Sequence, residues 1–404
     1  MKIIYDTDKQ KIPIKMWLEE IEDGAMEQII NLSNLPFAFK HVAIMPDCHQ
    51  GYGMPIGGVL ATKGVVIPNA VGVDIGCGMC AVKTSLKVEQ LDRETLKKIM
   101  GKIREFVPVG NGRDGSHKKK QCENLMPERD LYFLNRGNFI INSEYQSALT
   151  QLGTLGGGNH FIEIQKDIES NVWIMIHSGS RNLGYKVAKH YNNLAVELNE
   201  KWFSQVPNKW ELAFLPIGTP EAKDYLTEMQ YCVNFALANR RLMMNRIFDC
   251  IREFFPNLND KYIFGNRMIN IAHNYAVYEN HFGKDVIIHR KGATLARENT
   301  IGIIPGSQGT KSYIVIGLGN KESFESCSHG AGRLMGRKDA CRRLDLKEEI
   351  KKLDDQGIIH GIRNINNLEE ASGAYKKIED VINNQKDLVK ILTELSPLAV
   401  IKGE

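Results

Sequence analysis

The sequence lacks several features that would assign it to a common class of protein. No apolar run among its 404 residues approaches the length of a membrane span, so we do not expect an integral membrane protein. The N-terminal stretch MKIIYDTDKQKIPIKMW has neither the long apolar core nor the small-residue cleavage site of a secretory signal. Together these absences predict a cytoplasmic protein.

Cysteine is present, but it does not form a disulfide framework. The eight cysteines are scattered along the chain without regular spacing, which is typical of free thiols in a reducing compartment. Cys77 and Cys80 form a single C-x-x-C pair. A structural zinc site of this kind normally needs a second pair, so the pair by itself is a weak indication of zinc.

The common nucleotide-binding motifs are missing as well. The chain has no G-x-x-x-x-G-K-[ST] loop and no G-x-G-x-x-G opening a βαβ unit. The balance of 52 basic and 48 acidic residues gives a net charge of +4, which is too small to prove a polyanionic partner. Basic runs at 118–120, 240–241 and 342–343 are either phosphate-contacting patches or solvated faces.

Short apolar runs predict most of the strands. Over residues 36–85 such runs alternate with glycine and proline, which predicts several strands joined by tight turns. Further buried strands are expected at 171–177, 285–290 and 312–317. The polar stretch 110–150 is expected to be a surface excursion that carries a short helix.

Helical patterns occupy much of the rest. Apolar residues at helical spacing predict a helix over 87–106, and Pro220 is expected to open the longest helix, which runs to about residue 255. The charged region from 337 onward reads as mostly helical. We therefore expect an α+β (mixed α/β) fold: one large domain over 1–404 with central β-sheets around the site, and a helical excursion at about 180–255 that projects from it.

The stretch VGVDIGCGM, residues 71–79, brings a carboxylate and a thiol close together on backbone with little side-chain bulk. One interpretation is a buried strand that runs into a tight turn at Asp74, with Cys77 as a small buried residue. The other is a metal site, because carboxylate and thiolate are both metal ligands and glycine lets another group approach closely. These nine residues leave both open.

Five histidines lie in a shared local context. His49, His160, His177, His273 and His329 each sit at a glycine-rich turn or at the end of an apolar segment, where a scaffold presents reactive groups. One such histidine is more often a core residue than a ligand, but a repeated pattern favours a site for Zn, Mn, Fe or Co. The glycine-rich loops beside them are either tight turns or phosphate cradles.

Several motifs, read in order, resemble the RtcB family of RNA-splicing ligases. They are DIGCGM, GGGNHF, HSGSR, HNY, RKGA, PGS and SHGAGR. The resemblance runs from MPDCHQG near residue 45 to IKGE at 401–404, which is nearly the whole chain. It implies a GTP- and manganese-dependent enzyme that joins an RNA 3′-phosphate or 2′,3′-cyclic phosphate to a 5′-hydroxyl end, in tRNA splicing or RNA repair.

The resemblance also implies a ligand set for two manganese ions. The implied ligands are Asp74, Cys77, His160, His177 and His273. The Cys77 sulfur would bridge the ions, and the neighbouring glycines would leave room for both, in the manner of two-metal phosphoryl-transfer sites. Cys80 departs from the family pattern, which has a small polar residue there, and adds an oxidisable thiol.

The resemblance gives His329 the role of nucleophile, which attacks the α-phosphorus of GTP and carries GMP as a phosphoramidate. Asp47 and His49 are expected to assist hydrolysis or nucleophile activation, Arg333 to act catalytically on phosphate charge, and Arg181 to bind RNA phosphate. The implied nucleotide contacts are Asn159, Phe161, Glu163, Lys291, Ser307, Ser312 and Lys402, with the Glu163 carboxylate on the guanine N–H edge.

The expected partners are GTP and an RNA with those ends, from broken or spliced tRNA or from rRNA, and we expect a monomer. Two other functions stay open. A two-metal phosphodiesterase or phosphatase could use the same ligands without GTP, although it would need neither a nucleophilic histidine nor a guanine site. A non-catalytic RNA-binding protein on the same fold would not need the full ligand set.

Overall fold

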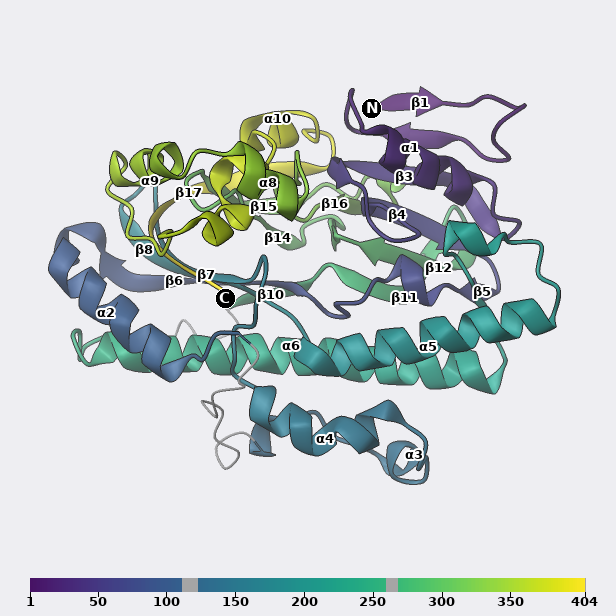
Figure 1. Cartoon of the computed structure of the whole chain (residues 1–404), viewed down its shortest axis with the longest axis horizontal. Helices are drawn as coiled ribbons and strands as arrows, with labels where there is room; N and C mark the ends of the chain where they lie inside the picture. Colours follow the sequence, from purple (N-terminus) through teal and green to yellow (C-terminus); the bar gives the residue numbers. More distant parts are fainter. Residues whose placement is uncertain (111–122, 259–267, 404) are drawn as a thin grey trace.

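Two β-sheets lie side by side in the computed structural model, which describes residues 1–110, 123–258 and 268–403 (Figure 1). The first has six strands in the order β1 (Lys2–Ile4), β2 (Ile14–Met16), β3 (Ala38–His49), β4 (Ile56–Thr62), β12 (Lys284–Lys291) and β11 (Asn274–His281). The second has seven, in the order β10 (Ile269–Ala272), β6 (Gly78–Lys87), β8 (Asn171–Ser178), β7 (Phe161–Asp167), β17 (Val389–Lys402), β15 (Ser312–Gly317) and β14 (Ile301–Ile304).

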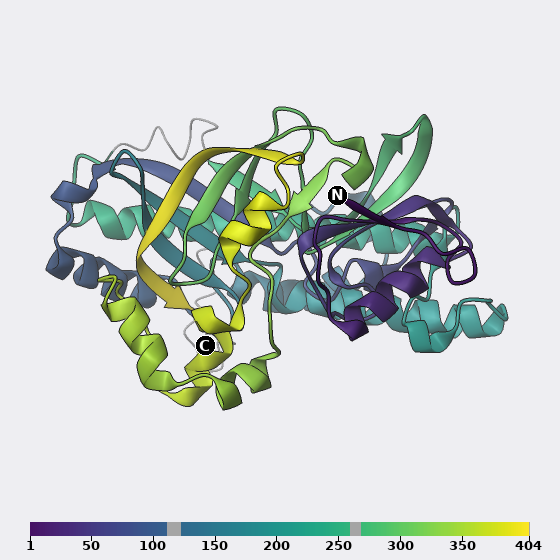
Figure 2. The same cartoon turned by 90° about the horizontal axis from the view of Figure 1, so that it is seen from above.

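Helices cover these sheets, and the mixed α/β class is confirmed (Figure 2). The α-helices are α1 (Asp23–Ser33), α2 (Arg93–Phe106), α3 (Leu131–Leu134), α4 (Ile140–Gln151), α5 (Arg181–Lys201), α6 (Pro220–Arg252), α8 (Arg337–Arg343), α9 (Leu346–Asp354) and α10 (Ile378–Asn383). Two short pairs, β13 (Ala293–Leu295) with β16 (Ser326–Ser328) and β5 (Val65–Val66) with β9 (Leu215–Pro216), complete the strands. Within the described ranges, no helix is long and apolar enough to cross a membrane.

The long helix α6 runs beneath both sheets (Figure 1). Thr219 caps its first turn and Pro220 occupies the first helical positions, as the sequence predicts. The helix contacts β6, β8 and β10 of the seven-stranded sheet and β11 of the other. Met243, Ile247 and Phe248 pack into the same apolar core as the sheet's own side chains. The 180–255 segment is therefore a helical layer against the sheets, with α5 packed on α6, rather than a projection.

Most of the predicted strands are confirmed, but two expectations need correction. The chain from 337 onward contains the expected helices, among them α8, α9 and α10, but it ends in the 14-residue strand β17. Proline is rare inside a strand because it has no N–H to donate, so Pro397 made β17 hard to predict. A β-bulge between Pro397 and Ala399 accommodates the proline. In VGVDIGCGM, a turn leads to Cys77 and strand β6 starts only at Gly78, so the strand follows Asp74 rather than preceding it.

At Gly78, strand β10 passes very close to the backbone of β6. A Cβ atom built on Gly78 would lie 1.9 Å from the carbonyl oxygen of Ile271, which is backbone and has no room to move within a paired strand. Glycine here allows the two strands that flank the site to pair at this register.

We expect Gly78→Ala to lower the thermal unfolding midpoint, with a loss of about 2 kcal/mol or more because backbone must shift. Gly101→Ala is the matched control: nothing lies within 4 Å of its added Cβ in the exposed interior of α2. There alanine should stabilise by about 0.5–1 kcal/mol. A Gly78→Ala protein as stable as wild type would contradict the close approach.

Candidate functional site

Five strand ends meet at one edge of the seven-stranded sheet. Strands β10, β6, β8, β7 and β17 are neighbours and run antiparallel, so their ends alternate between carboxyl and amino along that edge. His273 follows β10, Cys77 precedes β6, His177 lies near the end of β8, His160 precedes β7 and Lys402 ends β17. Residues as far apart in sequence as Cys77 and Lys402 are thereby gathered in one place.

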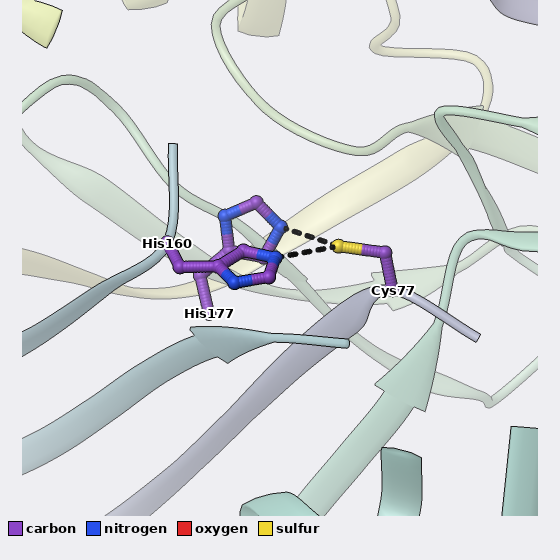
Figure 3. Close-up of side chains that lie close together, drawn as sticks. All are labelled: Cys77, His160 and His177. Atoms are coloured by element: carbon purple, nitrogen blue, oxygen red, sulfur yellow. Dashed lines mark hydrogen bonds between the residues drawn. The ribbon is translucent and has the colours of Figure 1, made fainter. Parts of the chain in front are cut away.

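The Cys77 sulfur is the meeting point of two imidazoles (Figure 3). Its Sγ lies 3.4 Å from Nε2 of His160 and 3.3 Å from Nε2 of His177. The other ring nitrogens face backbone carbonyls: Nδ1 of His160 is 2.9 Å from Leu155 O, and Nδ1 of His177 is 3.2 Å from Asn159 O. A carbonyl can only accept, so both rings donate through Nδ1. This leaves Nε2 of each ring on the sulfur side, where metal-bound histidines place their donor nitrogen.

Asp74 and His273 complete the cluster. Oδ2 of Asp74 lies 3.1 Å from Nε2 of His160, and the His273 ring centroid lies 5.2 Å from that of His177. Within the described part of the chain, the buried Nδ1 of His273 has no hydrogen-bond partner. An unpaired buried nitrogen is costly unless something binds it, so this atom, like the donor set, fits a cation.

The protonation states agree with that fit. Burial lowers the pKa of His177 and of His273 well below the ordinary value, so both rings are neutral and keep a lone pair. Burial would raise the pKa of Asp74, but the hydrogen bond and charge of His160 outweigh it and hold the pKa at about 2. Burial raises the pKa of the Cys77 thiol, and a cation would supply the charge that stabilises its thiolate.

Arg240 supports this edge from below, a role that the sequence did not indicate. Its guanidinium is fully buried and donates to Gly76 O at 3.0 Å, to Ser178 O at 2.8 Å and to the Asn270 side chain at 2.7 Å. It thus ties the Cys77 turn to the end of β8. Within the basic run at 240–241, Arg240 therefore lies neither on a solvated face nor in a phosphate-binding patch. The basic run at 118–120 lies outside the described residues.

His329 sits beside the cluster, held by a carboxylate from the other sheet. Its ring centroid is 4.7 Å from that of His273, and its Nδ1 is 2.7 Å from Oδ2 of Asp47, in β3. The same oxygen accepts from the backbone N–H groups of His329 and Gly330. Burial would raise the pKa of Asp47, but the charge and hydrogen bond of His329 lower it overall, so the carboxylate is ionised.

This arrangement fixes the tautomer of His329. An ionised carboxylate can only accept, so Nδ1 carries the proton, and in the neutral ring Nε2 has the lone pair. His329 also borders a pocket of about 810 Å³. Its other borders include His49, Asn159, Phe161, Glu163, His177, Ser307, Arg333 and Lys402. The structure thus brings most of the predicted nucleotide contacts around one cavity.

Glu163 lies on this pocket and is buried, and burial raises its pKa to about 7. Nε2 of Gln165 donates to Glu163 at 2.6 Å and to the Ser312 hydroxyl at 3.1 Å. Gln165 thus positions the Glu163 carboxyl group, a contact that the sequence analysis missed. The sequence could have indicated this contact, because Gln165 lies two residues after Glu163 in β7, and residues two apart in a strand face the same side.

A cationic corner borders the same pocket. Arg333 and Arg337 each donate to Oε1 of Glu370 at 3.1 Å, and Nζ of Lys402 lies 3.8 Å from Oε2. The Arg333 guanidinium also stacks over Tyr375, 5.1 Å from its ring centroid. Glu370 therefore organises the cations, and nothing in its sequence context marked it for that role.

Lys291 and Arg181 are placed differently from the other predicted contacts. Nζ of Lys291 is buried and donates to Tyr52 O at 2.5 Å and Asn69 O at 3.1 Å, and burial lowers its pKa to about 7. Arg181 donates to the Thr154 hydroxyl at 3.2 Å and to the backbone carbonyl of Gly110 at 3.1 Å. Both cations bind the protein itself in this structure.

A second group of possible metal ligands is an ion-pair network. Glu279, His281 and Glu325 lie close together, but Arg290 binds both Glu279 oxygens, at 2.7 and 3.0 Å, and Arg297 binds Glu325 at 2.9 Å. Because two guanidinium cations already neutralise these carboxylates, the group has no charge left for a metal ion. Cys80 is equally inert, since burial raises its thiol pKa to about 12.

The buried imidazoles and the buried Cys77 thiol, with the part-exposed Asp74 carboxylate and the neighbouring His329, define a candidate metal centre beside a polar pocket. Comparison with known proteins then gives the family. A family model described as tRNA-splicing ligase RtcB matches residues 28–403. The chain belongs to the RtcB family.

Individual relatives agree over nearly their full lengths. The chain is 38% identical to the RNA-splicing ligase RtcB of Escherichia coli (strain K12), over 98% of each chain. It is 33% identical to the tRNA-splicing ligase RtcB of Nanoarchaeum equitans, over 98% of this chain and 96% of that one. With the tRNA-splicing ligase RtcB of Thermococcus kodakarensis the identity is 32%, over 95% and 92%.

We expect Cys77→Ala to weaken metal binding by at least about tenfold, because even residues outside the ligand shell cost that much when removed. The measurement is metal per chain by elemental analysis after dialysis against a limiting Mn²⁺ concentration. Cys341→Ala, which changes a half-buried thiol away from the site, is the control and should keep the wild-type content. Equal metal content in both variants would rule out Cys77 as a ligand.

Proposed function

We propose that this protein is a GTP- and manganese-dependent RNA ligase. It would join an RNA 3′-phosphate or 2′,3′-cyclic phosphate to a 5′-hydroxyl end through a His329–GMP intermediate. The family and the names of its relatives support RNA ligation. The observation that most supports this chemistry is the 2.7 Å contact between Asp47 and Nδ1 of His329. His329 borders a pocket of about 810 Å³ that is lined by polar side chains.

The first step uses the free Nε2 of His329. Its lone pair attacks the α-phosphorus of GTP, a P–N bond forms, and the bond to the β-phosphate oxygen breaks, so that pyrophosphate leaves. The proton stays on Nδ1, where the Asp47 carboxylate stabilises the positive charge that develops on the ring. Arg333 and Lys402, on the same pocket, are suited to neutralise phosphate charge.

Later steps transfer the GMP group. Where the RNA ends in a cyclic phosphate, water first attacks the phosphorus and the bond to the 2′-oxygen breaks, which leaves a 3′-phosphate and a 2′-hydroxyl. An oxygen of the RNA 3′-phosphate then attacks the phosphorus on His329, the P–N bond breaks, and its electron pair returns to Nε2. The 5′-hydroxyl then attacks the activated RNA phosphate and GMP leaves. His49 is suited to accept the hydroxyl proton: burial lowers its pKa to about 4, so its ring is neutral, and its Nδ1 is occupied by Asp47 O at 3.0 Å.

Asp74, Cys77, His160, His177 and His273 would hold the metal ions. Bound cations supply Lewis-acid stabilisation of phosphate charge. The residues fit manganese as they fit zinc, iron or cobalt, since all accept imidazole and carboxylate donors. Glu163 would accept from the guanine N–H edge once ionised. Gln165 holds the Glu163 carboxylate in place, and the Ser312 hydroxyl accepts from the same Gln165 amide.

Incubation with GTP labelled at the α-phosphate and Mn²⁺ is expected to give an acid-labile, alkali-stable protein–GMP adduct. His329→Ala should abolish it. Asp47→Asn should slow its formation by about 10²-fold or more, because charge stabilisation of the ring is lost.

The same labelling reaction with Zn²⁺, Co²⁺ or Fe²⁺ in place of Mn²⁺ tests the metal assignment. Hydrolysis of cyclic-phosphate RNA without any labelling would instead favour the phosphodiesterase.

Guanine binding is expected to depend on pH through Glu163. With a pKa of about 7, its carboxyl is protonated below that pH and has lost an acceptor, so affinity should rise from pH 6 to 8 and then level off. The affinity should change by at most about tenfold per pH unit. Guanosine is the probe, because it carries no titrating phosphate. Glu163→Gln should bind more weakly and without this dependence, whereas an unchanged pH profile in that variant would remove Glu163 from the guanine site.

A further inference from the structure

The loop between β3 and β4 carries an exposed aromatic side chain to the border of the nucleotide pocket. Tyr52 is 70% exposed, and it borders the same cavity of about 810 Å³ as His49 and His329. Among the described residues, no aromatic ring or cation packs against Tyr52.

The backbone beneath this ring is held at several points. Gln28 makes two hydrogen bonds with the peptide groups of Gly51, at 2.6 and 3.1 Å. Gly53 N donates to the Glu211 carboxylate at 3.0 Å, and the buried Lys291 ammonium donates to the carbonyl of Tyr52 itself at 2.5 Å. The loop therefore fixes the base of the side chain and leaves the ring free. This explains the placement of Lys291, which the sequence analysis had assigned to the nucleotide.

Cations border the same pocket. Arg337, whose side chain is 50% exposed, and the exposed Lys338 both line it, at the start of α8. An aromatic surface together with cations around a groove is the combination that binds single-stranded nucleic acid, because bases stack on the ring while phosphates pair with the cations. The guanine-contacting candidate Glu163 comes from β7, a different part of the pocket wall.

We propose that Tyr52 is a base-stacking residue for the single-stranded RNA end that reacts beside His329. The proposal rests on the proposed function, since it assumes that an RNA end enters this pocket. Stacking on an aromatic face does not depend on the identity of the base, so Tyr52 would hold RNA ends of varied sequence in place. It would act on RNA affinity rather than on the attack of His329 on GTP.

The test uses Tyr52→Ala and Tyr52→Phe in the full chain, with Tyr5→Ala as the control, since Tyr5 is also exposed, at 53%, but lies on the N-terminal segment away from the pocket lining. The probe is a short single-stranded RNA with 2-aminopurine next to its reactive end. Tyr52→Ala should bind it about 5- to 100-fold more weakly and lose the fluorescence quenching caused by stacking. Tyr52→Phe and Tyr5→Ala should behave as wild type.

The outcomes separate the two proposals. Binding and quenching by Tyr52→Ala equal to wild type would overturn the role of Tyr52, whether or not the wild-type protein forms a GMP adduct. An equal loss in Tyr5→Ala would show that the effect is not local and would overturn it too. A rise in the KM for GTP, rather than for RNA, would place the ring on the nucleotide and likewise overturn it. Absence of any GMP adduct on wild type is the separate failure of the proposed function.

Discussion

The pairing of β10, β6, β8, β7 and β17 is the constraint on which the site depends. Because these neighbours run antiparallel, alternate carboxyl and amino ends fall at one edge, and residues from five distant segments meet there. The register matters at the level of single residues, since Phe161 pairs with both His177 and Lys402. A slip by one residue would turn each of these side chains to the opposite face.

The six-stranded sheet contributes Asp47 and His49, which lie at the end of β3. His273 stands between β10 and β11, so the chain passes from one sheet to the other at the candidate metal centre itself. Asp47, in β3 of the six-stranded sheet, binds both the ring and the backbone of His329. The nucleophile candidate is thus oriented by one sheet and the ligand candidates by the other. Relative movement of the sheets would change the distance between the two parts of the site.

The sequence predicts those features that depend on local chemistry. Pro220 marks the start of α6, and histidines at the ends of apolar segments and at glycine-rich turns mark the site. It does not predict features that depend on tertiary contacts. Pro397 argues against β17 until the bulge is seen, and the partners of Asp47 and Gln165 lie 282 and 147 residues away. The buried cation Arg240 reads as surface charge because only packing reveals what its guanidinium binds.

The most direct test of the central claim is the position of Mn²⁺ in crystals of the protein, located by anomalous scattering. The account predicts two sites that share the Cys77 sulfur and are bound by the imidazoles of His160, His177 and His273, with His329 left free of metal. Manganese bound instead at Glu279, His281 and Glu325, or at His329 in place of Cys77, would contradict it.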